Sequence, residues 1–287
     1  MSLRGAPFVV AAVLTEWRAS GRSLASLPDV TPDSRAIGGL VYDALQAETI
    51  SIAGHNGDHI KAYFARPLGS GPYPGVVVIH HAPGWDEWST EVTRKFAAHG
   101  YLALCPHLYD RVGAHLSPDD AAAMARASGG ISDEQFLGDA AGAVGFLRAL
   151  PNSNTKVGTI GYCSGGRQSF LAACSLDLDA AVDCYGACVV NAPPPDIPIT
   201  LTPCVDLTER LSCPLLGLFG EDDKMPAPAE TAELARVLDK YAKTYQFHTY
   251  AGAGHAFFAT NRPSYRVEAA NDGWNRVFQW FGQYLAA

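Results

Sequence analysis

The sequence predicts an α/β fold with a mostly parallel central sheet, helices on both faces of that sheet and an N-terminal extension. Beyond residue 67, short apolar runs alternate with segments of helical periodicity, which is the pattern of strands and helices in such a fold. Apolar residues make up 48% of the 287 residues and charged residues only 17%, so the chain can bury a large core and is not disordered.

The N-terminal boundary of the folded domain is expected near residue 47. Residues 1–46 hold a segment containing Ser, Pro and Asp and a helix-like stretch at Ile37–Gln46, so we assign them to an extension and residues 47–287 to one domain. Apolar and polar residues then alternate on both sides of a turn at His55–Asp58, which predicts a β-hairpin at the start of the domain.

Apolar runs after the hairpin predict the remaining strands. They lie at Val76–His80, Tyr101–Cys105, Val157–Gly161, Ala180–Tyr185, Leu215–Phe219 and Tyr245–Tyr250. Ser117 and Ser132 have the sequence context of helix N-caps, and apolar residues at three- and four-residue spacings predict a final helix over Val267–Leu285. The segment Cys188–Cys213 is rich in proline and has little periodicity, so it either borders the site or forms an irregular surface loop.

Composition disfavours several classes of function. The 21 basic and 29 acidic residues give a net charge of -8 without a basic cluster, which argues against nucleic-acid binding. No apolar run approaches the roughly 20 residues of a membrane span, so we expect no membrane partner. The seven cysteines form an odd set without a C-x-x-C pair, which predicts neither a disulfide framework nor a thiolate zinc site and favours a cytoplasmic location.

The clearest chemical motif is the segment Gly161–Gly166, which has the pattern G-x-C-x-G-G between a predicted strand and a predicted helix. A nucleophile on such a sharp turn needs an unfavourable backbone angle, and the flanking glycines remove side chains that would collide. The backbone N–H of Ser164 would then face a developing oxyanion at the helix N-terminus. The same helix end lowers the pKa of a thiol, so the motif favours Cys163 as a nucleophile.

Two later strand ends supply partners for this nucleophile. The strand Leu215–Phe219 is followed closely by a run of acidic residues, and the strand Tyr245–Tyr250 is followed by a glycine-rich loop with His255. The chain order of nucleophile, acid and histidine is that of α/β-hydrolases. We therefore expect a catalytic triad of Cys163, Asp222 and His255, with no metal and no cofactor.

Together these motifs resemble the dienelactone hydrolase (carboxymethylenebutenolidase) family of α/β-hydrolases over roughly Thr49–Tyr284. The segments that carry the resemblance are Gly100–Tyr109, Lys156–Gly166, Asp222–Pro228 and Ala253–Phe257. The resemblance implies an α/β-hydrolase fold, a cysteine nucleophile completed by Asp and His, and hydrolysis of a lactone or ester. It also selects Asp222, by its spacing to Pro226, and implies that the N–H of Ala82 is the second oxyanion donor.

The sequence departs from the family at the position of a Glu that bonds the resting thiol and at the arginines that hold the substrate carboxylate. The family's first-described members have a Glu where this chain has His81, and one of their two carboxylate-binding arginines corresponds to Ala259 here. Arg126 lies near the position of the other arginine. His81, Trp85 and Arg126 are therefore the candidate pocket or supporting residues.

The sequence thus predicts a hydrolase that cleaves a small ester or lactone through a thioester acyl-enzyme. Two alternatives stay open. The same triad could serve a thioesterase or acyltransferase, and a reactive cysteine on this scaffold could serve ligand binding or redox sensing without turnover. The physiological substrate and the assembly into a homo-oligomer are also left open.

Overall fold

The computed structural model describes residues 44–195, 199 and 201–286. Most of the predicted N-terminal extension, residues 1–43, lies outside the described residues. The first strand begins at Leu45, so the end of the helix-like stretch predicted at Ile37–Gln46 belongs to a strand. The predicted hairpin forms there, with a short 3₁₀ turn, η2 (His55–Gly57), between its two strands.

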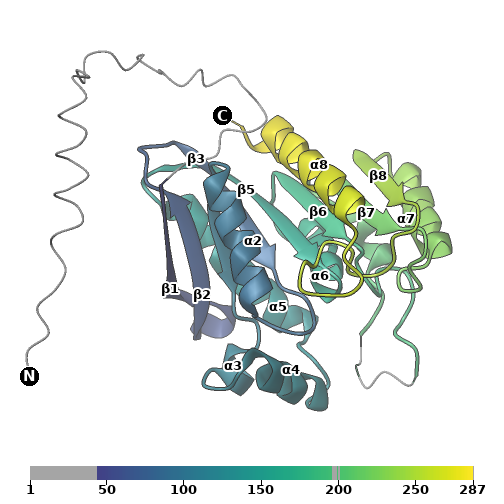
Figure 1. Cartoon of the computed structure of the whole chain (residues 1–287), viewed down its shortest axis with the longest axis horizontal. Coiled ribbons are helices and arrows are strands. Elements are labelled where there is room, and N and C mark those ends of the chain that lie inside the picture. Colours follow the sequence, from purple (N-terminus) through teal and green to yellow (C-terminus); the bar gives the residue numbers. More distant parts are fainter. Residues whose placement is uncertain (1–43, 196–198, 200, 287) are drawn as a thin grey trace, which may run out of the picture. The chain divides into compact units, whose positions relative to one another are not determined.

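The described residues form one eight-stranded sheet in the order β1-β2-β4-β3-β5-β6-β7-β8 (Figure 1). Strands β1 and β2 and strands β2 and β4 pair antiparallel, and every other neighbouring pair is parallel. The strands are β1 Leu45–Ala53, β2 His59–Pro67, β3 Tyr73–Ile79, β4 Leu102–Pro106, β5 Ser153–Tyr162, β6 Ala180–Cys184, β7 Leu215–Gly220 and β8 Tyr245–Tyr250. This topology confirms the mostly parallel sheet that the sequence predicts.

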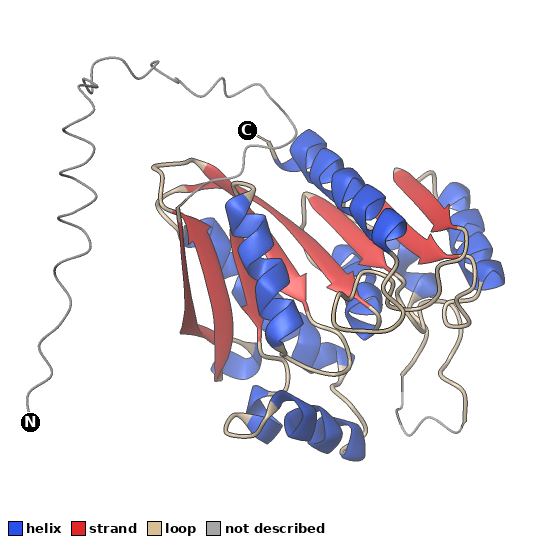
Figure 2. Cartoon of the chain, in the orientation of Figure 1, coloured by secondary structure: helices blue, strands red, loops and turns tan. Residues whose placement is uncertain are grey.

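Helices cover both faces of the sheet (Figure 2). The α-helices are α2 Glu87–Ala98, α3 Asp110–Gly113, α4 Pro118–Ala127, α5 Asp133–Ala149, α6 Ser164–Ser175, α7 Pro228–Lys240 and α8 Val267–Leu285. Helices α2 and α8 pack on one face, while α5, α6 and α7 pack on the other, and each layer encloses its own apolar cluster. A second 3₁₀ helix, η3 (Val205–Arg210), lies in the proline-rich segment.

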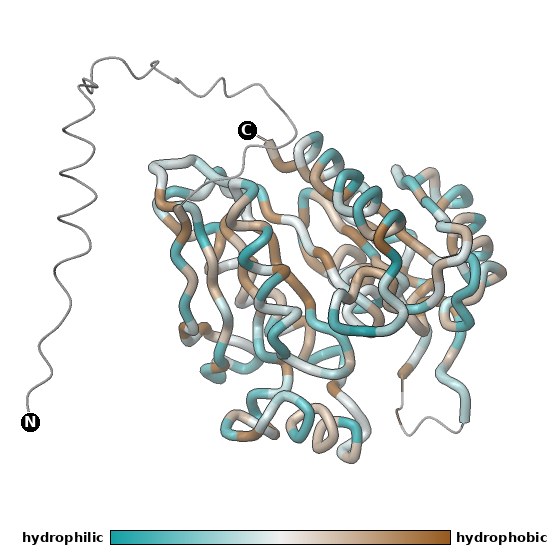
Figure 3. Tube along the Cα trace, in the orientation of Figure 1, coloured by the Kyte–Doolittle hydropathy of each residue, from teal (hydrophilic) through white to brown (hydrophobic). Residues whose placement is uncertain are grey.

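The central strands are apolar along most of their length because both of their faces are covered (Figure 3). In β3, Val76 and Val78 face the layer of α2 and α8, whereas Val77 and Ile79 face the opposite layer. The helix starts follow the sequence signals, since Ser117 Oγ accepts from Asp120 N and Ser132 Oγ accepts from Gln135 N. Within the described residues, no helix has the length and apolarity to cross a bilayer.

The parallel strands matter for the site because their carboxyl ends meet at one edge of the sheet. Strands β3, β5, β7 and β8 end at that edge, and the loops that follow them carry the polar side chains predicted to react. The sequence places these residues far apart in the chain. The sheet order brings their loops together.

Candidate active site

Cys163 lies on a sharp turn between β5 and α6, with a φ of 58° and a ψ of -120°. A positive φ is unfavourable for a residue with a side chain and persists only where the surroundings impose it. A Cβ on Gly161 would lie 1.8 Å from Gly165 O, and one on Gly165 would lie 2.4 Å from Ile79 O. The turn therefore closes only because glycine stands at these positions, as the G-x-C-x-G-G pattern predicts.

Three groups converge on the Cys163 thiol. His255 makes a side-chain hydrogen bond to the sulfur, and the backbone N–H groups of Ser164 and Ala82 also interact with it. Burial alone would raise the pKa of the thiol, but these three interactions outweigh it and hold the pKa below its ordinary value of 9.0. Both N–H groups were expected from the sequence as oxyanion donors, and both interact with this one sulfur atom. Among the described cysteines, Cys163 is partly exposed and the other six are buried.

The carboxylate that contacts His255 is Asp223, whose Oδ2 lies 2.9 Å from His255 Nδ1. This corrects the sequence-based choice of Asp222, because the side chain of Asp222 is exposed while Asp223 is only 4% exposed. The spacing to Pro226 selected Asp222, but the carboxylate that contacts His255 belongs to the next residue, Asp223.

The turn after β7 explains which carboxylate points inward. Asp223 N donates to Gly220 O at 3.3 Å, and Asp223 Oδ1 accepts from Met225 N at 2.9 Å, so the turn folds the carboxylate back toward the sheet edge. Asp222 is fixed through its backbone instead, with its N–H donating to Ala253 O in the histidine loop. Its side chain is left in solvent.

His255 is held as a cation by its neighbours. Burial alone would lower its pKa, but the hydrogen bonds to Asp223 and Cys163 outweigh that effect and raise the pKa to about 10. The ring also packs edge-on against Tyr185, with centroids 5.1 Å apart. Because the thiol pKa is lowered and the imidazole pKa is raised, the pair favours a thiolate beside an imidazolium.

The loop after β3 carries Ala82 and is fixed from several sides. His80 Nδ1 lies 2.9 Å from His81 O, and His80 Nε2 accepts from Leu108 N at 3.3 Å. Complete burial lowers the pKa of His80 to about 3, so the ring is neutral and can fill both roles. Tyr109 Oη donates to Ala82 O at 3.1 Å. These hydrogen bonds fix the loop that carries the backbone N–H of Ala82.

His81 and Trp85, both named from the sequence as candidate pocket residues, are bonded within the protein. His81 is buried, with Nε2 2.8 Å from Asp86 Oδ2 and its ring against Trp88. Trp85 donates from Nε1 to Cys105 O at 3.1 Å and stacks on a neighbouring ring. Neither residue lines the pocket beside the oxyanion donors. Both act on the shape of the loop.

Arg126 does line that pocket, together with both predicted oxyanion donors. The pocket has an empty volume of about 540 Å³, part of it open to solvent. Its lining residues are Ala82, Leu108, Tyr109, Ala125, Arg126, Gly130, Ile131, Ser164, Arg167, Gln168, Ile199 and Leu201. Arg126 is exposed and approaches Ala82 O at 3.4 Å through Nη1. No ion pair of Arg126 occurs among the described residues.

The second arginine of the pocket, Arg167, has its guanidinium bonded to other parts of the protein. Its guanidinium makes a two-pronged contact with Asp133, at 2.7 and 2.8 Å, and donates to Thr202 O at 2.6 Å. Only 1% of the residue is exposed. Arg167 therefore ties α6 to α5 and to the proline-rich segment, which forms part of the pocket wall through Ile199 and Leu201.

Two residues of the site were not assigned from the sequence. Asp223 was passed over in favour of its neighbour, and the choice depends on a turn geometry that spacing alone does not encode. Tyr109 lies in a segment that carried the family resemblance, so the signal was present without a role attached. In the described part of the chain, no group of three or more His, Cys, Asp or Glu residues is arranged to hold a metal ion.

Comparison with known proteins agrees with the fold and the motifs. The model of the dienelactone hydrolase family matches residues 60–285. A putative carboxymethylenebutenolidase of Escherichia coli K12 is 34% identical over 268 residues, 90% of this chain and 94% of that protein. One from Methylorubrum extorquens AM1 is 36% identical over 233 residues, 79% of this chain and 78% of that protein.

A solved structure gives the same result in three dimensions. The crystal structure of a putative dienelactone hydrolase from Klebsiella pneumoniae aligns with a TM-score of 0.73 and 32% sequence identity. The alignment covers 84% of this chain and all of that chain. With the family match over most of its length, the chain belongs to the dienelactone hydrolase family and is a hydrolase with an α/β-hydrolase fold.

Proposed function

We propose that the protein hydrolyses a small ester or lactone with Cys163 as nucleophile, His255 as acid and base, and Asp223 as the group that orients His255. One observation carries the proposal: a single imidazole contacts the thiol on one side and a buried carboxylate on the other. In nucleophilic acyl transfer, an imidazole links the nucleophile to an orienting carboxylate in this way.

The first half of the reaction forms an acyl-enzyme. The Cys163 thiolate attacks the carbonyl carbon of the substrate, and the carbonyl oxygen gains negative charge. We expect the N–H groups of Ser164 and Ala82 to stabilise that oxyanion, and their interaction with the sulfur at rest supports this role. When the C–O bond breaks, the imidazolium of His255 gives its proton to the leaving alkoxide. A thioester on Cys163 remains.

The second half releases the acid. His255, now neutral, takes a proton from a water molecule, and the resulting hydroxide attacks the thioester carbonyl. The same two N–H groups stabilise the second oxyanion, and its collapse expels the Cys163 thiolate beside a protonated His255. Asp223 stays ionised and fixes the ring orientation through both steps.

The pocket beside the oxyanion donors supports a narrower substrate class. Its walls are largely apolar, and Arg126 brings one positive charge that no described carboxylate neutralises. A small acyl group that bears a carboxylate fits this combination, because Arg126 would pair with the carboxylate while Leu108 and Ile131 contact the carbon frame. The proposed substrate is therefore an anionic lactone or ester.

The experiment that tests the triad is hydrolysis of p-nitrophenyl acetate by purified variants. We expect Cys163→Ala and His255→Ala each to lower kcat by at least about 10²-fold, because a positioned base and the nucleophile act as one unit. Cys188→Ala is the matched control, since it removes a buried thiol without removing the proposed nucleophile. Full activity in Cys163→Ala would overturn the proposal.

The substrate class is tested separately with Arg126→Gln. On esters that differ only in a terminal carboxylate or methyl ester, the variant should raise KM for the anionic substrate roughly tenfold and leave the neutral one unchanged. Equal effects on both substrates would remove the carboxylate assignment while leaving the triad intact.

A further inference from the structure

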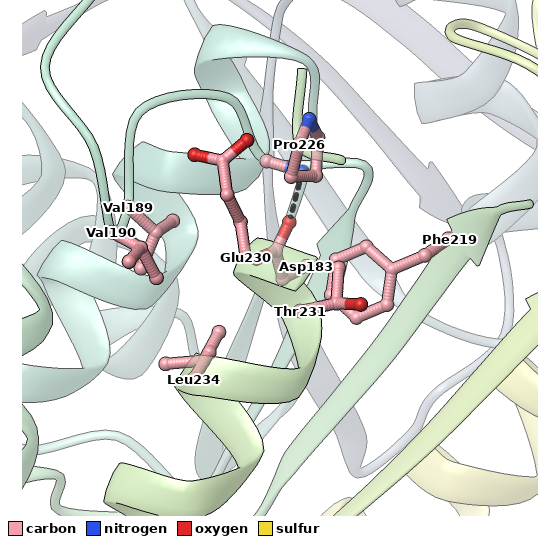
Figure 4. Close-up of a pocket in the computed structure, with 9 residues that line it drawn as sticks. Asp183, Val189, Val190, Phe219, Pro226, Glu230, Thr231 and Leu234 are labelled. Carbon is pink, nitrogen blue, oxygen red and sulfur yellow. Dashed lines mark hydrogen bonds between the residues drawn. The ribbon is translucent and has the colours of Figure 1, made fainter. Parts of the chain in front are cut away.

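A second pocket, between β6, β7 and the start of α7, offers little room to a substrate (Figure 4). Its interior holds about one water-sized group, and its walls are mostly apolar, with Phe219 and Leu234 among them. Asp183 Oδ1 accepts from Gly186 N at 2.7 Å, the dashed line in Figure 4, and Asp183 Oδ2 is buried without a partner in the described structure. Recognition of a substrate is therefore expected in the larger pocket, beside the oxyanion donors.

One wall of that larger pocket comes from the first two turns of α6. Ser164, Arg167 and Gln168 line the pocket from this helix. Arg167 is paired with Asp133, and only 1% of the residue is exposed, so its charge is already neutralised. The groups that this wall offers to a ligand are therefore neutral, namely the hydroxyl of Ser164 and the amide of Gln168.

The amide of Gln168 is an unused hydrogen-bonding group. It has no hydrogen-bond partner among the described residues, although the residue is half-buried. A polar group at such a place is satisfied by water or by a ligand. By contrast, Tyr109 Oη, in the same lining, is bonded to Ala82 O. The Gln168 amide is thus free both to donate and to accept in the pocket.

The geometry of α6 directs this amide toward the oxyanion donors. Gln168 lies four residues after Ser164, and residues at that spacing share one face of a helix, about 5 to 6 Å apart. Helical side chains also lean toward the helix N-terminus, which here carries the Ser164 N–H. A substrate group that meets the amide should therefore lie only a few bonds from the reacting carbonyl.

The pocket receives the acyl part of the substrate rather than its leaving group. In the proposed reaction His255 gives its proton to the leaving alkoxide, and His255 is not among the residues that line this pocket. Ala82 and Ser164, which carry the proposed oxyanion donors, are among them. A group bound there is attached to the carbonyl carbon and stays on Cys163 in the acyl-enzyme.

We propose that Gln168 binds a hydroxyl group on the acyl chain and thereby determines which esters or lactones are hydrolysed. The inference rests on the proposed function, because it takes Cys163 as the nucleophile. A hydroxyl both donates and accepts, as the amide does. On the third carbon of the acyl chain, with one hydrogen bond of about 2.8 Å, it spans roughly the 5 to 6 Å between the two helical positions. Arg126 carries the positive charge that the amide lacks and remains the group for a carboxylate.

The experiment compares p-nitrophenyl 3-hydroxybutyrate with p-nitrophenyl 3-methylbutyrate, two neutral esters in which a hydroxyl and a methyl group occupy the same position. In Gln168→Met, kcat/KM for the hydroxy ester relative to the methyl ester should fall about tenfold, because the hydroxyl would face an apolar side chain. Gln135→Met is the matched control and should keep the wild-type ratio, since Gln135 is also a half-buried glutamine in a helix but does not line the pocket.

An unchanged ratio in Gln168→Met, with both esters still cleaved, would overturn this inference and leave the proposed triad standing. An increase in KM confined to an ester with a terminal carboxylate would also overturn it, because the amide would then serve the carboxylate together with Arg126. Failure of the triad has a different signature, which is full activity of Cys163→Ala on p-nitrophenyl acetate.

Discussion

Tyr109 Oη donates a hydrogen bond to the carbonyl oxygen of Ala82, 3.1 Å away, on the residue whose N–H faces the Cys163 sulfur. The Tyr109 loop follows β4 and the Ala82 loop follows β3, and these strands are neighbours in the sheet. His80 joins the same two loops through Leu108 N. The position of one proposed oxyanion donor is thus set by a side chain from the next strand.

Tyr109→Phe should therefore weaken catalysis without weakening binding. Loss of the hydroxyl leaves the Ala82 carbonyl only the longer contact from Arg126 Nη1, at 3.4 Å, and lets its peptide move. We therefore expect kcat to fall about tenfold, less than loss of a whole oxyanion donor, with KM nearly unchanged. Steady-state ester hydrolysis measures both constants. Tyr101→Phe, in the aromatic cluster with Phe96 and Phe281, is the control and should be close to wild type. A pure KM effect in Tyr109→Phe would contradict this role.

Asp223→Asn and Asp222→Asn form a matched pair that distinguishes the two neighbouring carboxylates. Asp223→Asn should lower kcat by about 10²-fold or more, because an amide cannot stabilise the imidazolium of His255 as the carboxylate does. Asp222→Asn changes an exposed side chain and should stay within about twofold of wild type. The reverse order of effects would restore Asp222 as the acid.

The pH profile of kcat/KM should be bell-shaped with an unusually alkaline upper limb. Activity rises as the Cys163 thiol ionises through its lowered pKa, and it falls near pH 10 as the imidazolium of His255 loses the proton it gives to the leaving group. In Asp223→Asn the upper limb should move toward neutral pH, because a hydrogen bond that raises the pKa of His255 is weakened. An unmoved upper limb in that variant would contradict the assignment.

His80 should make the fold sensitive to acid. Its folded pKa of about 3 lies below the ordinary 6.5, so the unfolded chain binds the extra proton between these values. The free energy of unfolding should then fall by about 1.4 kcal/mol per pH unit as the pH drops below 6.5. Urea unfolding should show this slope reduced in His80→Asn and retained in His59→Asn, a change at an exposed histidine. Equal slopes in all three proteins would exclude His80 as the cause.

Most of the fold could be predicted from the sequence, because buried parallel strands and capped helices leave strong local signals. Strand β8 has the predicted bounds, Tyr245–Tyr250, and α8 occupies Val267–Leu285. The sharp turn at Cys163 could also be predicted, because the glycines that it requires for steric reasons lie within six residues of chain.

The features that could not be predicted from the sequence depend on the direction in which side chains point. Which of two adjacent carboxylates points inward is decided by the hydrogen bonds of Asp223 with Gly220 and Met225, and no periodicity reports them. The pocket at Arg126 likewise forms from several loops that lie far apart in the chain. The incomplete bonding of Asp183 emerges only when β6 is packed against its neighbours.

The contrast between Cys163 and the other thiols has a practical consequence. Burial raises the pKa of all six remaining cysteines, whereas that of Cys163 is lowered and its side chain is partly exposed. Iodoacetamide at neutral pH should therefore label each folded molecule once, and intact-mass spectrometry would count that single adduct. Counting this adduct would measure the fraction of molecules in a preparation that have a reactive Cys163, before a substrate is known.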